Sequence, residues 1–518
     1  MSFSRRRERC YQMADVLAVR DDYRAQTWRM LIQECSNSGL TKREFCRRRG
    51  ISEKCFQTPK GCYLYDRYSN SVIRVSTEQY DELVKIEAGL AEASSSYVIK
   101  ELQEKGICLP GEVKEIFHPM TPFLTHLLQH RIRDVILQVT QNCNLRCGYC
   151  TYGGNYKNRT HSLKTMNFEL AKKAIDFGVE RSQESSDFVV SFYGGEPLLA
   201  FNLIKKCVAY AKENIQGKEL HFNMTTNGTL LTTEIMDFLV ENRFQLLISL
   251  DGDKESHDAN RVFKSGKGSF DLIMQNVRNF KARHPSYVAE HVQFNTVINP
   301  KTNPSCFDEF FSVSSVFQDT HIMFNEVASS NVKENSLVSF GENYRIKRKF
   351  EFLKLFMSMS GKLDERYVSR LVKESKRSYY DLYKELRLHT AISSVMHPQG
   401  PCIPGIVRLF VNVNGEFFPC EKVPELAYSC IGNIDNGFDI ERIKQVMNIG
   451  RLSEKECKSC WAVRLCSCCL NDIECHNCTI DCQSKLAGCG ERKNMALSNL
   501  FDITVLSENG FELPLEEE

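Results

Sequence analysis

Short hydrophobic runs recur between positions 135 and 325, and longer amphipathic stretches separate them. The runs predict strands at Val135–Thr140, Phe188–Tyr193, Leu220–Met224, Gln245–Leu250, His291–Ile298 and His321–Asn325. Most intervening stretches have helical periodicity, for example Asn167–Val179, Leu203–Asn214, Thr233–Glu241 and Phe270–Ala282. Strands that alternate with helices are typical of a parallel sheet with right-handed crossovers. Because a complete barrel has eight such units, six predict an α/β fold with a partial (β/α)6 TIM-like barrel over residues 132–330.

A smaller domain is predicted ahead of the barrel, over residues 61–131. Two strands, Tyr63–Tyr68 and Ser71–Ser76, flank the turn residues Ser69-Asn70. Helices are predicted after them, over Glu78–Leu90 and Ser95–Lys105. A strand pair followed by helices is a winged-helix-like pattern. We expect this domain to recognise a peptide, because a sheet edge can pair with an extended chain.

Residues 1–57 form a separate basic segment. Residues 23–56 resemble small helix-turn-helix accessory proteins of insertion elements. In those proteins a recognition helix follows, whereas here the pattern breaks at Thr58-Pro59. We interpret the segment as a fusion remnant, with DNA binding as the alternative.

Three segments follow the barrel. Residues 335–395 are charged and helical in pattern and are interpreted as an insert or linker. Residues 400–495 are dense in cysteine, and residues 496–518 form a C-terminal tail that ends in LPLEEE.

The overall composition excludes several classes of protein. The 518 residues are 42% hydrophobic and 25% charged with a formal net charge of +2, which is typical of a globular protein and gives no sign of a nucleic-acid partner. No apolar run is long enough to be a signal peptide or a membrane span. The sequence therefore predicts a cytoplasmic protein without a membrane partner.

Cysteine is the residue that changes this picture. The chain has 23 cysteines, an odd number, and many of them lie at close spacings. The cytosol keeps disulfides reduced. The spacing therefore favours ligation of metal ions or clusters.

One cysteine group directly follows the first predicted barrel strand. Cys143, Cys147 and Cys150 are spaced C-x3-C-x2-C. A four-iron cluster normally takes four thiolates, so three leave one iron open for another ligand. Structural zinc would need a fourth Cys or His, which this loop lacks. The loop is also at the carboxyl end of its strand, where active sites of barrels lie.

This motif resembles the CxxxCxxC loop of radical S-adenosylmethionine enzymes. The resemblance implies a catalytic 4Fe-4S cluster on these three cysteines. It also implies S-adenosyl-L-methionine (AdoMet) on the open iron, cleaved to a 5′-deoxyadenosyl radical. Further polar residues at later strand ends match the cofactor-binding positions of the family. They are Gly194, Gly195, Glu196, Thr225, Asn227, Ser249, Asp251 and Arg261. Tyr149 could stack on adenine or serve in packing.

The C-terminal cysteines resemble the SPASM domain of radical enzymes that modify peptides. The resemblance implies two auxiliary 4Fe-4S clusters. One would use Cys402, Cys420 and either Cys468 or Cys469. The other would use Cys457, Cys460, Cys466 and a late cysteine, for which Cys489 is placed best and Cys475, Cys478 and Cys482 compete. The family spacing would put a cysteine at Leu470, which is a departure. Zinc knuckles are the alternative for this segment.

The whole chain resembles maturases of cysteine-rich ribosomal peptides. The implied reaction is hydrogen abstraction from a precursor peptide, followed by a thioether cross-link. A reductant protein such as flavodoxin or ferredoxin would supply electrons. A sulfatase-type formylglycine maturase and a peptide epimerase are alternatives, the latter with Cys306 or Cys430 as hydrogen donor. A zinc-containing nucleic-acid-binding regulator is an alternative of another class.

Overall fold

Two units make up this chain in the computed structural model. The structure describes residues 53–157, 160–300, 304–318, 320–398, 400, 402–473 and 479–512, without the side chains of 304–308. The division between the units falls between Pro110 and Gly111. Residues 1–52 are outside the described part of the chain, and they include most of the segment that resembles a helix-turn-helix protein. The interpretation of that segment therefore stays a prediction.

The first unit consists of a three-stranded antiparallel sheet and two helices. The strands are β1 (Lys54–Thr58), β2 (Gly61–Asp66) and β3 (Ser71–Val75), in that order across the sheet. The helices are α3 (Thr77–Glu87), which Ser76 caps through a capping box, and α4 (Tyr97–Glu104). Strand β1 was not expected from the sequence, where residues up to 57 were assigned to the basic segment. It forms because Cys55 and Phe56 are buried and because its backbone pairs with β2.

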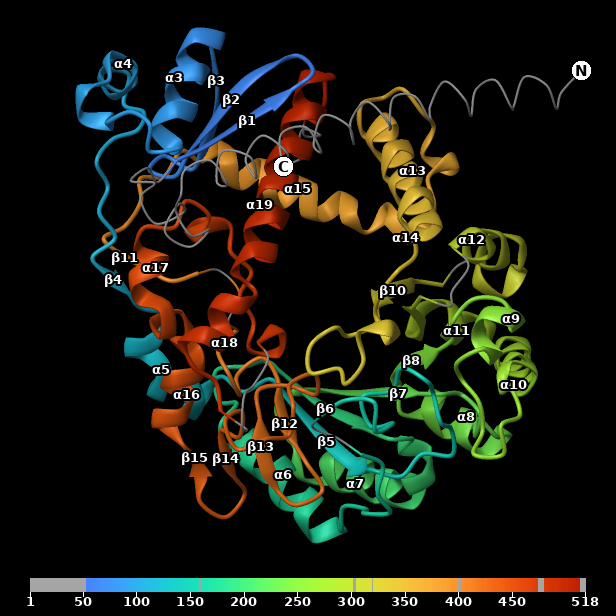
Figure 1. Ribbon diagram of the computed structural model, residues 1–518. Helices are drawn as coiled ribbons and strands as arrows, with labels where there is room; N and C mark the ends of the chain where they lie inside the picture. The colour runs from blue at the N-terminus through green and yellow to red at the C-terminus, as the bar shows by residue number, and fades with distance from the viewer. Residues whose placement is uncertain are drawn as a thin grey trace, which may run out of the picture. The chain divides into compact units, whose positions relative to one another are not determined.

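The second unit contains the sheet that the hydrophobic runs predict. Six parallel strands follow one another in chain order, as Figure 1 shows. They are β5 (Asp134–Thr140), β6 (Asp187–Gly194), β7 (Glu219–Thr226), β8 (Gln245–Ser249), β9 (Val292–Ile298) and β10 (Ile322–Glu326). The helices between them include α6 (Phe168–Glu180), α7 (Phe201–Asn214), α8 (Thr233–Glu241) and α10 (Phe270–Arg283). The predicted α/β fold with six parallel strands in chain order is therefore confirmed.

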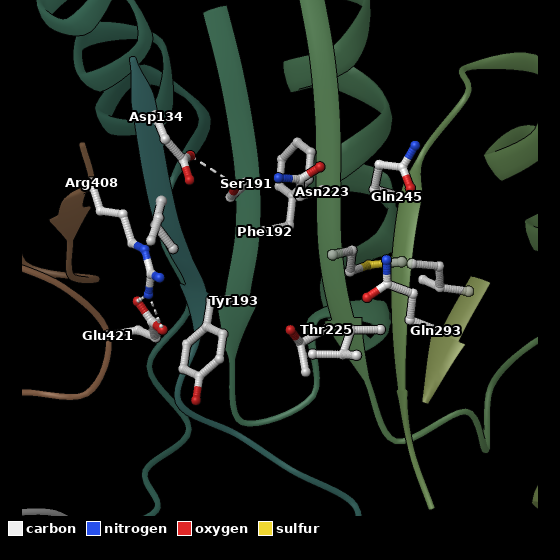
Figure 2. A pocket seen from close by; sticks show the side chains of 14 residues that line it. Asp134, Ser191, Phe192, Tyr193, Asn223, Thr225, Gln245, Gln293, Arg408 and Glu421 are labelled. Carbon is white, nitrogen blue, oxygen red and sulfur yellow. Dashed lines mark hydrogen bonds and ion pairs between the residues drawn. The ribbon is translucent and has the colours of Figure 1, made fainter. Parts of the chain in front are cut away.

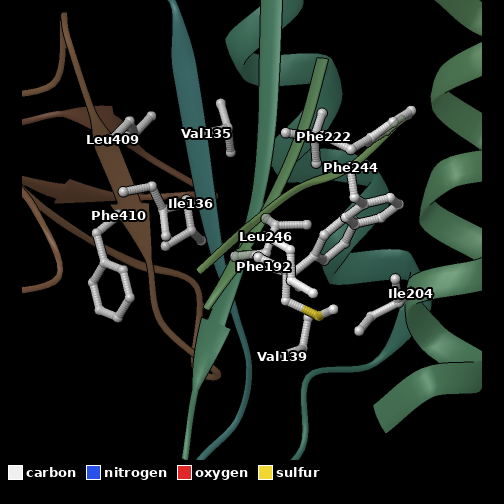
Figure 3. Packing of buried hydrophobic residues seen from close by; sticks show 14 of the residues in the cluster. Val135, Ile136, Val139, Phe192, Ile204, Phe222, Phe244, Leu246, Leu409 and Phe410 are labelled. Atoms are coloured by element: carbon white, nitrogen blue, oxygen red, sulfur yellow. The ribbon is translucent and has the colours of Figure 1, made fainter. Parts of the chain in front are cut away.

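Hydrophobic packing fixes the helices against one face of this sheet. Phe192, Phe222 and Phe244 are buried and stack in a row between the strands and α7, where Ile204 meets them (Figure 3). Each such side chain contributes roughly 1.5–3 kcal/mol through the apolar surface that it buries. The other face of the strands is free to carry polar groups.

A strand from the cysteine-rich segment extends the barrel sheet beyond β5. Strand β12 (Leu409–Val411) pairs in parallel with β5, and all three of its residues are buried. The antiparallel strands β13 (Glu416–Phe418), β14 (Gly432–Asn433) and β15 (Gly437–Phe438) follow. The cysteine-rich segment is thus joined to the barrel through one continuous sheet of ten strands.

Long helices occupy the regions that the sequence assigned to an insert and a tail. The insert holds α13 (Glu342–Met359) and α15 (Ser375–Arg387), and the C-terminal helix is α19 (Cys489–Glu508). The hydroxyl of Tyr379 donates to the Asp502 carboxylate across α15 and α19 at 3.2 Å. Among the described helices, none combines the length and the apolar character needed to span a membrane.

Candidate functional site

The Cys143 loop leaves the sheet at the carboxyl end of β5. Its backbone is held by bonds from the Leu145 amide to the Cys143 sulfur at 3.4 Å and from the Gly148 amide to the Asn260 carbonyl at 3.0 Å. Burial raises the pKa of the Cys143 thiol to about 11 and that of Cys147 to about 12, and each also feels the charge of Cys150. The three thiols therefore lie together, and a bound iron would have to displace their protons.

Two glycines let the end of β6 approach this loop. A Cβ on Gly194 would lie 2.1 Å from the Thr140 carbonyl oxygen, and one on Gly195 would lie 2.3 Å from that of Asn142. Without these Cβ atoms, the two segments come close enough for two backbone hydrogen bonds of 2.9 Å. The Gly195 amide donates to the Thr140 carbonyl, and the Glu196 amide donates to the Asn142 carbonyl. The glycines therefore serve the close packing of β6 on the cysteine loop.

Glu196 is fully buried and links three strand ends. Its carboxylate accepts hydrogen bonds from the Leu198 amide at 3.0 Å, from the Thr226 hydroxyl at 2.7 Å and from the Asn227 amide at 2.7 Å. Burial raises the pKa of this carboxyl to about 6, although these three bonds act in the opposite direction. One carboxylate oxygen accepts only one of the three bonds, so it retains capacity for a further donor.

Asn227 connects β7 to the cysteine loop. Its side-chain amide donates to the Asn144 side chain at 2.8 Å and lies 3.9 Å from the Cys143 sulfur. Asn144 in turn donates to the Thr229 hydroxyl at 2.8 Å. The sequence pattern included Thr226 in the polar tip of this strand but did not single out Asn144 or Thr229, because short polar residues at strand ends are common in ordinary turns.

Tyr149, Asp251 and Arg261 form one group, in which Asp251 and Arg261 are buried and Tyr149 is half-buried. The Tyr149 hydroxyl donates to the Asp251 carboxylate, and Arg261 donates to the same carboxylate through Nε at 2.9 Å. The Arg261 guanidinium lies 5.3 Å from the centre of the Tyr149 ring. Tyr149 therefore packs within the protein in this structure, and Arg261 pairs with Asp251. Ser249 is buried at the end of β8, two residues ahead of Asp251.

A polar cleft of about 400 Å³ lies against the strands of the sheet, on the amino-terminal side of these strand ends (Figure 2). Its polar lining comes from β5 to β9 and from the segment around β12. These residues are Asp134, Ser191, Tyr193, Asn223, Thr225, Gln245, Gln293, Arg408 and Glu421. Apart from Thr225, the sequence analysis did not identify them. The available signal is that polar residues alternate on the strands of a sheet that is otherwise buried on both sides.

Charged groups gather on one wall of this cleft. Arg408 donates to the Glu421 carboxylate at 2.9 Å, and the Ser191 hydroxyl donates to Asp134 at 2.8 Å, as Figure 2 shows. Burial raises the pKa of Asp134 to about 7, the nearby charge of Glu421 adds to the rise, and that of Arg408 opposes it. A carboxyl in this state can accept or release a proton near neutral pH.

Asp134→Asn is expected to stabilise the protein more at high pH than at low pH. The folded state raises the pKa of Asp134 from 3.8 to about 7, so ionisation opposes folding increasingly as the pH rises between these values. Asparagine can still accept the Ser191 bond. The gain in Tm should be at least about 2 °C at about pH 8 and close to zero at about pH 4, measured by thermal unfolding.

Asp187→Asn is the matched control on the neighbouring strand. The hydrogen bond from Arg133 lowers the pKa of Asp187, so this carboxylate stabilises the fold at neutral pH and loses that effect as the pH falls. Its substitution should therefore lower Tm at the higher pH. An Asp134→Asn variant with equal shifts of Tm at both pH values would contradict the assignment.

The C-terminal cysteines separate into two groups. Burial, followed by the charges of Asp472, Cys420 and Cys402, raises the pKa of the Cys469 thiol to about 11. Burial also raises the pKa of Cys402, with Cys420 as its strongest charged neighbour. We call Cys402, Cys420 and Cys469 the first group.

The second group surrounds the start of α19. Burial raises the pKa of the Cys460 thiol, and the charges of Cys457 and Cys489 add to the rise. Burial likewise raises the pKa of the Cys468 thiol, and the same two neighbours add to it. Burial and Cys468 together raise the pKa of Cys466 to about 12. The second group is therefore Cys457, Cys460, Cys466, Cys468 and Cys489. Cys482 begins the short helix α18 (Cys482–Ala487), and Cys475 and Cys478 lie outside the described residues.

The donor atoms of these groups are all thiol sulfurs, which suit both zinc and iron–sulfur clusters. Tetrahedral zinc with Zn–S bonds of about 2.3 Å would hold its sulfurs roughly 3.8 Å apart. Within the described parts of the chain, no three cysteines bring all their sulfurs within 4.8 Å of one another. A four-iron cluster spreads its thiolates, because each is bound to a different iron. The described thiols therefore form no ready-made zinc site of three cysteines, and their donor set suits iron–sulfur clusters.

Comparisons with known proteins agree with this site. Residues 137–313 match the model of the Radical SAM superfamily. An uncharacterized protein of Methanocaldococcus jannaschii is 29% identical over 64% of this chain and 95% of its own length. A cysteine-type anaerobic sulfatase-maturating enzyme of Clostridium novyi is 31% identical over 33% of this chain, and the match spans 44% of that enzyme. The solved structure of native anSMEcpe with bound AdoMet and Cp18Cys peptide has a TM-score of 0.52 at 20% identity, and covers 73% of this chain and 99% of its own.

The fold, the cysteine loop and the superfamily match define this protein as a radical SAM enzyme. Within that class it is related to the maturating enzymes, of which the sulfatase-maturating type is one. A regulator that binds nucleic acid through zinc receives no support from these matches.

Proposed function

We propose that this enzyme modifies a cysteine-rich ribosomal peptide by forming thioether cross-links. One observation supports this proposal above others. Glu421 lines the cleft, and its chain neighbour Cys420 belongs to the first group of C-terminal cysteines. A peptide in the cleft would therefore lie between the Cys143 loop at the strand ends and a second iron–sulfur site at the wall.

We propose that Cys143, Cys147 and Cys150 hold the catalytic 4Fe-4S cluster. When bound, this cluster and AdoMet supply a 5′-deoxyadenosyl radical that removes a hydrogen atom from the substrate. Glu196 retains acceptor capacity for the amino group of AdoMet, next to Gly194 and Gly195. Arg261 donates to Asp251 through Nε. Its terminal N–H groups would pair with the carboxylate of the cofactor.

We assign the auxiliary sites to the two cysteine groups. Cys469, rather than Cys468, would complete the first group, because its charged neighbours are Cys402 and Cys420. Three thiols leave one iron of a four-iron cluster open, and a thiolate of the substrate would suit that position. Cys457, Cys460, Cys466 and Cys489 would hold the other cluster.

The thioether reaction balances with these parts. A sulfur–carbon bond replaces one S–H and one C–H bond of the peptide. The hydrogen atom from carbon goes to 5′-deoxyadenosine, the thiol proton goes to a cleft carboxylate, and one electron is left for an auxiliary cluster. Asp134 is a suitable proton acceptor by its position in the cleft and its pKa of about 7.

We also propose a partner for the first unit. Its sheet has β1 and β3 at the two edges, and an extended precursor peptide could add a strand to either. Electrons for the clusters would come from a reductant protein of the flavodoxin or ferredoxin kind.

A formylglycine maturase of the sulfatase type is the second candidate. The match to the Clostridium novyi enzyme favours it. The anSMEcpe structure leaves more than a quarter of this chain uncovered, however, and the chain thus has parts beyond that fold.

Mass spectrometry of a peptide substrate distinguishes these functions. The full chain, with its clusters reconstituted anaerobically, would be incubated with AdoMet, dithionite and the synthetic product of a short cysteine-rich reading frame next to its gene. A thioether removes two hydrogens and one free thiol per cross-link, which is the expected result. Formylglycine would replace the thiol by an aldehyde that reacts with hydrazine. An epimerase would leave the mass unchanged in H₂O and add deuterium in D₂O. Either of these two products would overturn the thioether proposal.

A further inference from the structure

Lys485 is a buried cation in the middle of the second cysteine group. It lies on α18 and is only 2% exposed. Its ammonium donates to the Cys457 sulfur at 3.1 Å and to the Ser453 hydroxyl. The Ser453 hydroxyl is itself 3.4 Å from the same sulfur. Lysine is rarely buried this far unless its charge is compensated.

No carboxylate in the described parts of the chain supplies that compensation. Among the described residues, Lys485 forms no ion pair with Asp or Glu, and its side-chain partners are the Cys457 sulfur and the Ser453 oxygen. The charged groups that act on it are the thiols of Cys457, Cys468 and Cys489. Its negative partners are therefore sulfur atoms.

A second buried cation adjoins the first. Arg492 on α19 is 9% exposed and donates to the Lys485 carbonyl at 3.2 Å. Its charge also acts on Cys466 and Cys468 and on the Asp472 carboxyl. Two positive groups in one cysteine cage indicate that the cage holds net negative charge when it is complete.

A four-iron cluster with four thiolates carries such a charge. In its oxidised state the [4Fe–4S] core is 2+, so four thiolates leave a net charge of about −2, and reduction makes it more negative. Hydrogen bonds to the sulfurs and nearby positive charge favour the reduced state and raise the reduction potential. A cation 3.1 Å from a ligand sulfur is placed to have this effect.

We propose that Lys485, with Arg492 beside it, is a positioning residue that raises the reduction potential of the second auxiliary cluster through its hydrogen bond to Cys457. This proposal rests on the proposed function, in which the second group holds a four-iron cluster. A cluster tuned in this way would accept the electron released by substrate more readily than one surrounded by neutral groups.

The test is a potentiometric titration followed by electron paramagnetic resonance. It would use the full chain with Cys143→Ala, Cys147→Ala and Cys150→Ala, so that only auxiliary signals remain. Lys485→Met removes the charge and the donor, and Lys485→Arg keeps the charge. Lys493→Met is the matched control, because Lys493 lies one residue beyond Arg492 on α19 and acts on Cys460 from an exposed position. Solvent and salt screen such an exposed charge.

We expect one of the two auxiliary midpoint potentials to become more negative in Lys485→Met. The shift should be smaller in Lys485→Arg, and smaller also in Lys493→Met, whose exposed charge is screened by solvent. Unchanged midpoints in a Lys485→Met protein with full iron content would overturn the proposal. If that variant loses iron, Lys485→Gln keeps a donor without the charge, and an unchanged midpoint there would overturn it equally. A parent protein with zinc or with a single auxiliary signal would instead refute the second cluster itself.

Discussion

Cys147→Ala should reduce the cleavage of AdoMet to 5′-deoxyadenosine by more than about 100-fold, because even indirect partners of a metal site are worth 10–100-fold. Cys147 is one of only three thiols on the loop after β5, and losing it leaves too few ligands for the catalytic cluster. Iron should fall from about twelve to about eight per chain if three four-iron clusters form in the parent. Chromatography of the quenched, dithionite-reduced reaction measures the nucleoside.

Cys207→Ala is the control for this variant. Cys207 is fully buried in α7 among core residues, and it lies far in sequence from each cysteine group. Its substitution removes a buried sulfur without touching a proposed ligand, so iron content and AdoMet cleavage should stay at the parent values. Retained cleavage in Cys147→Ala would refute the assignment of the catalytic loop.

Cys420→Ala should separate cofactor cleavage from peptide modification. The first group would keep two thiols, Cys402 and Cys469, which cannot hold a four-iron cluster stably. We expect about eight irons per chain, continued formation of 5′-deoxyadenosine and loss of the cross-linked product to below roughly 1% of the parent, since a lost ligand should cost at least as much as a lost indirect partner. Iron analysis and mass spectrometry of the peptide measure the two effects.

Cys430→Ala is the matched control in the same segment. The Cys430 thiol is half-buried and donates to the Gly432 carbonyl at 3.3 Å, and it is outside both cysteine groups. Its substitution should leave iron and product formation intact. Loss of turnover with full iron in this variant would favour the epimerase alternative, in which Cys430 donates hydrogen. Cross-linking by Cys420→Ala would contradict the role of the first group.

The parallel strands could be predicted because each one is a short hydrophobic run in the sequence. Val135, Leu137 and Val139 face helices, and strands buried on both sides read as hydrophobic runs with few interruptions. Helix starts were similarly visible, as at Thr232, which caps α8 through its hydroxyl.

Strands β12 and β1 are among those that the sequence did not predict, and the reasons differ. Strand β12 has only three residues, too few for any period to be recognised. Strand β1 lies at the end of a segment whose resemblance to another protein directed attention to helices. Its residues Lys54–Thr58 do not alternate in burial, since Cys55 and Phe56 are both buried, and the strand is recognised only by its pairing with β2.

The sequence predicts candidate ligands but not the contacts around them. Cysteine spacing together with the family resemblance indicated the Cys143 loop and the C-terminal groups. It could not show that Arg261 pairs with Asp251, or that Lys485 reaches Cys457, because both contacts depend on how distant elements pack. The polar cleft was missed for the same reason, since each of its residues is unremarkable in its own strand.

The pairing of β12 with β5 makes the two halves of the second unit mutually dependent. Deleting everything beyond position 400 would strip β5 of its neighbour along Val135, Ile136 and Leu137 and leave their backbone groups unsatisfied. Such an edge invites association with other chains. The cysteine-rich portion is consequently part of the same sheet as the barrel strands. A truncated chain that ends before it should not fold as an independent radical enzyme.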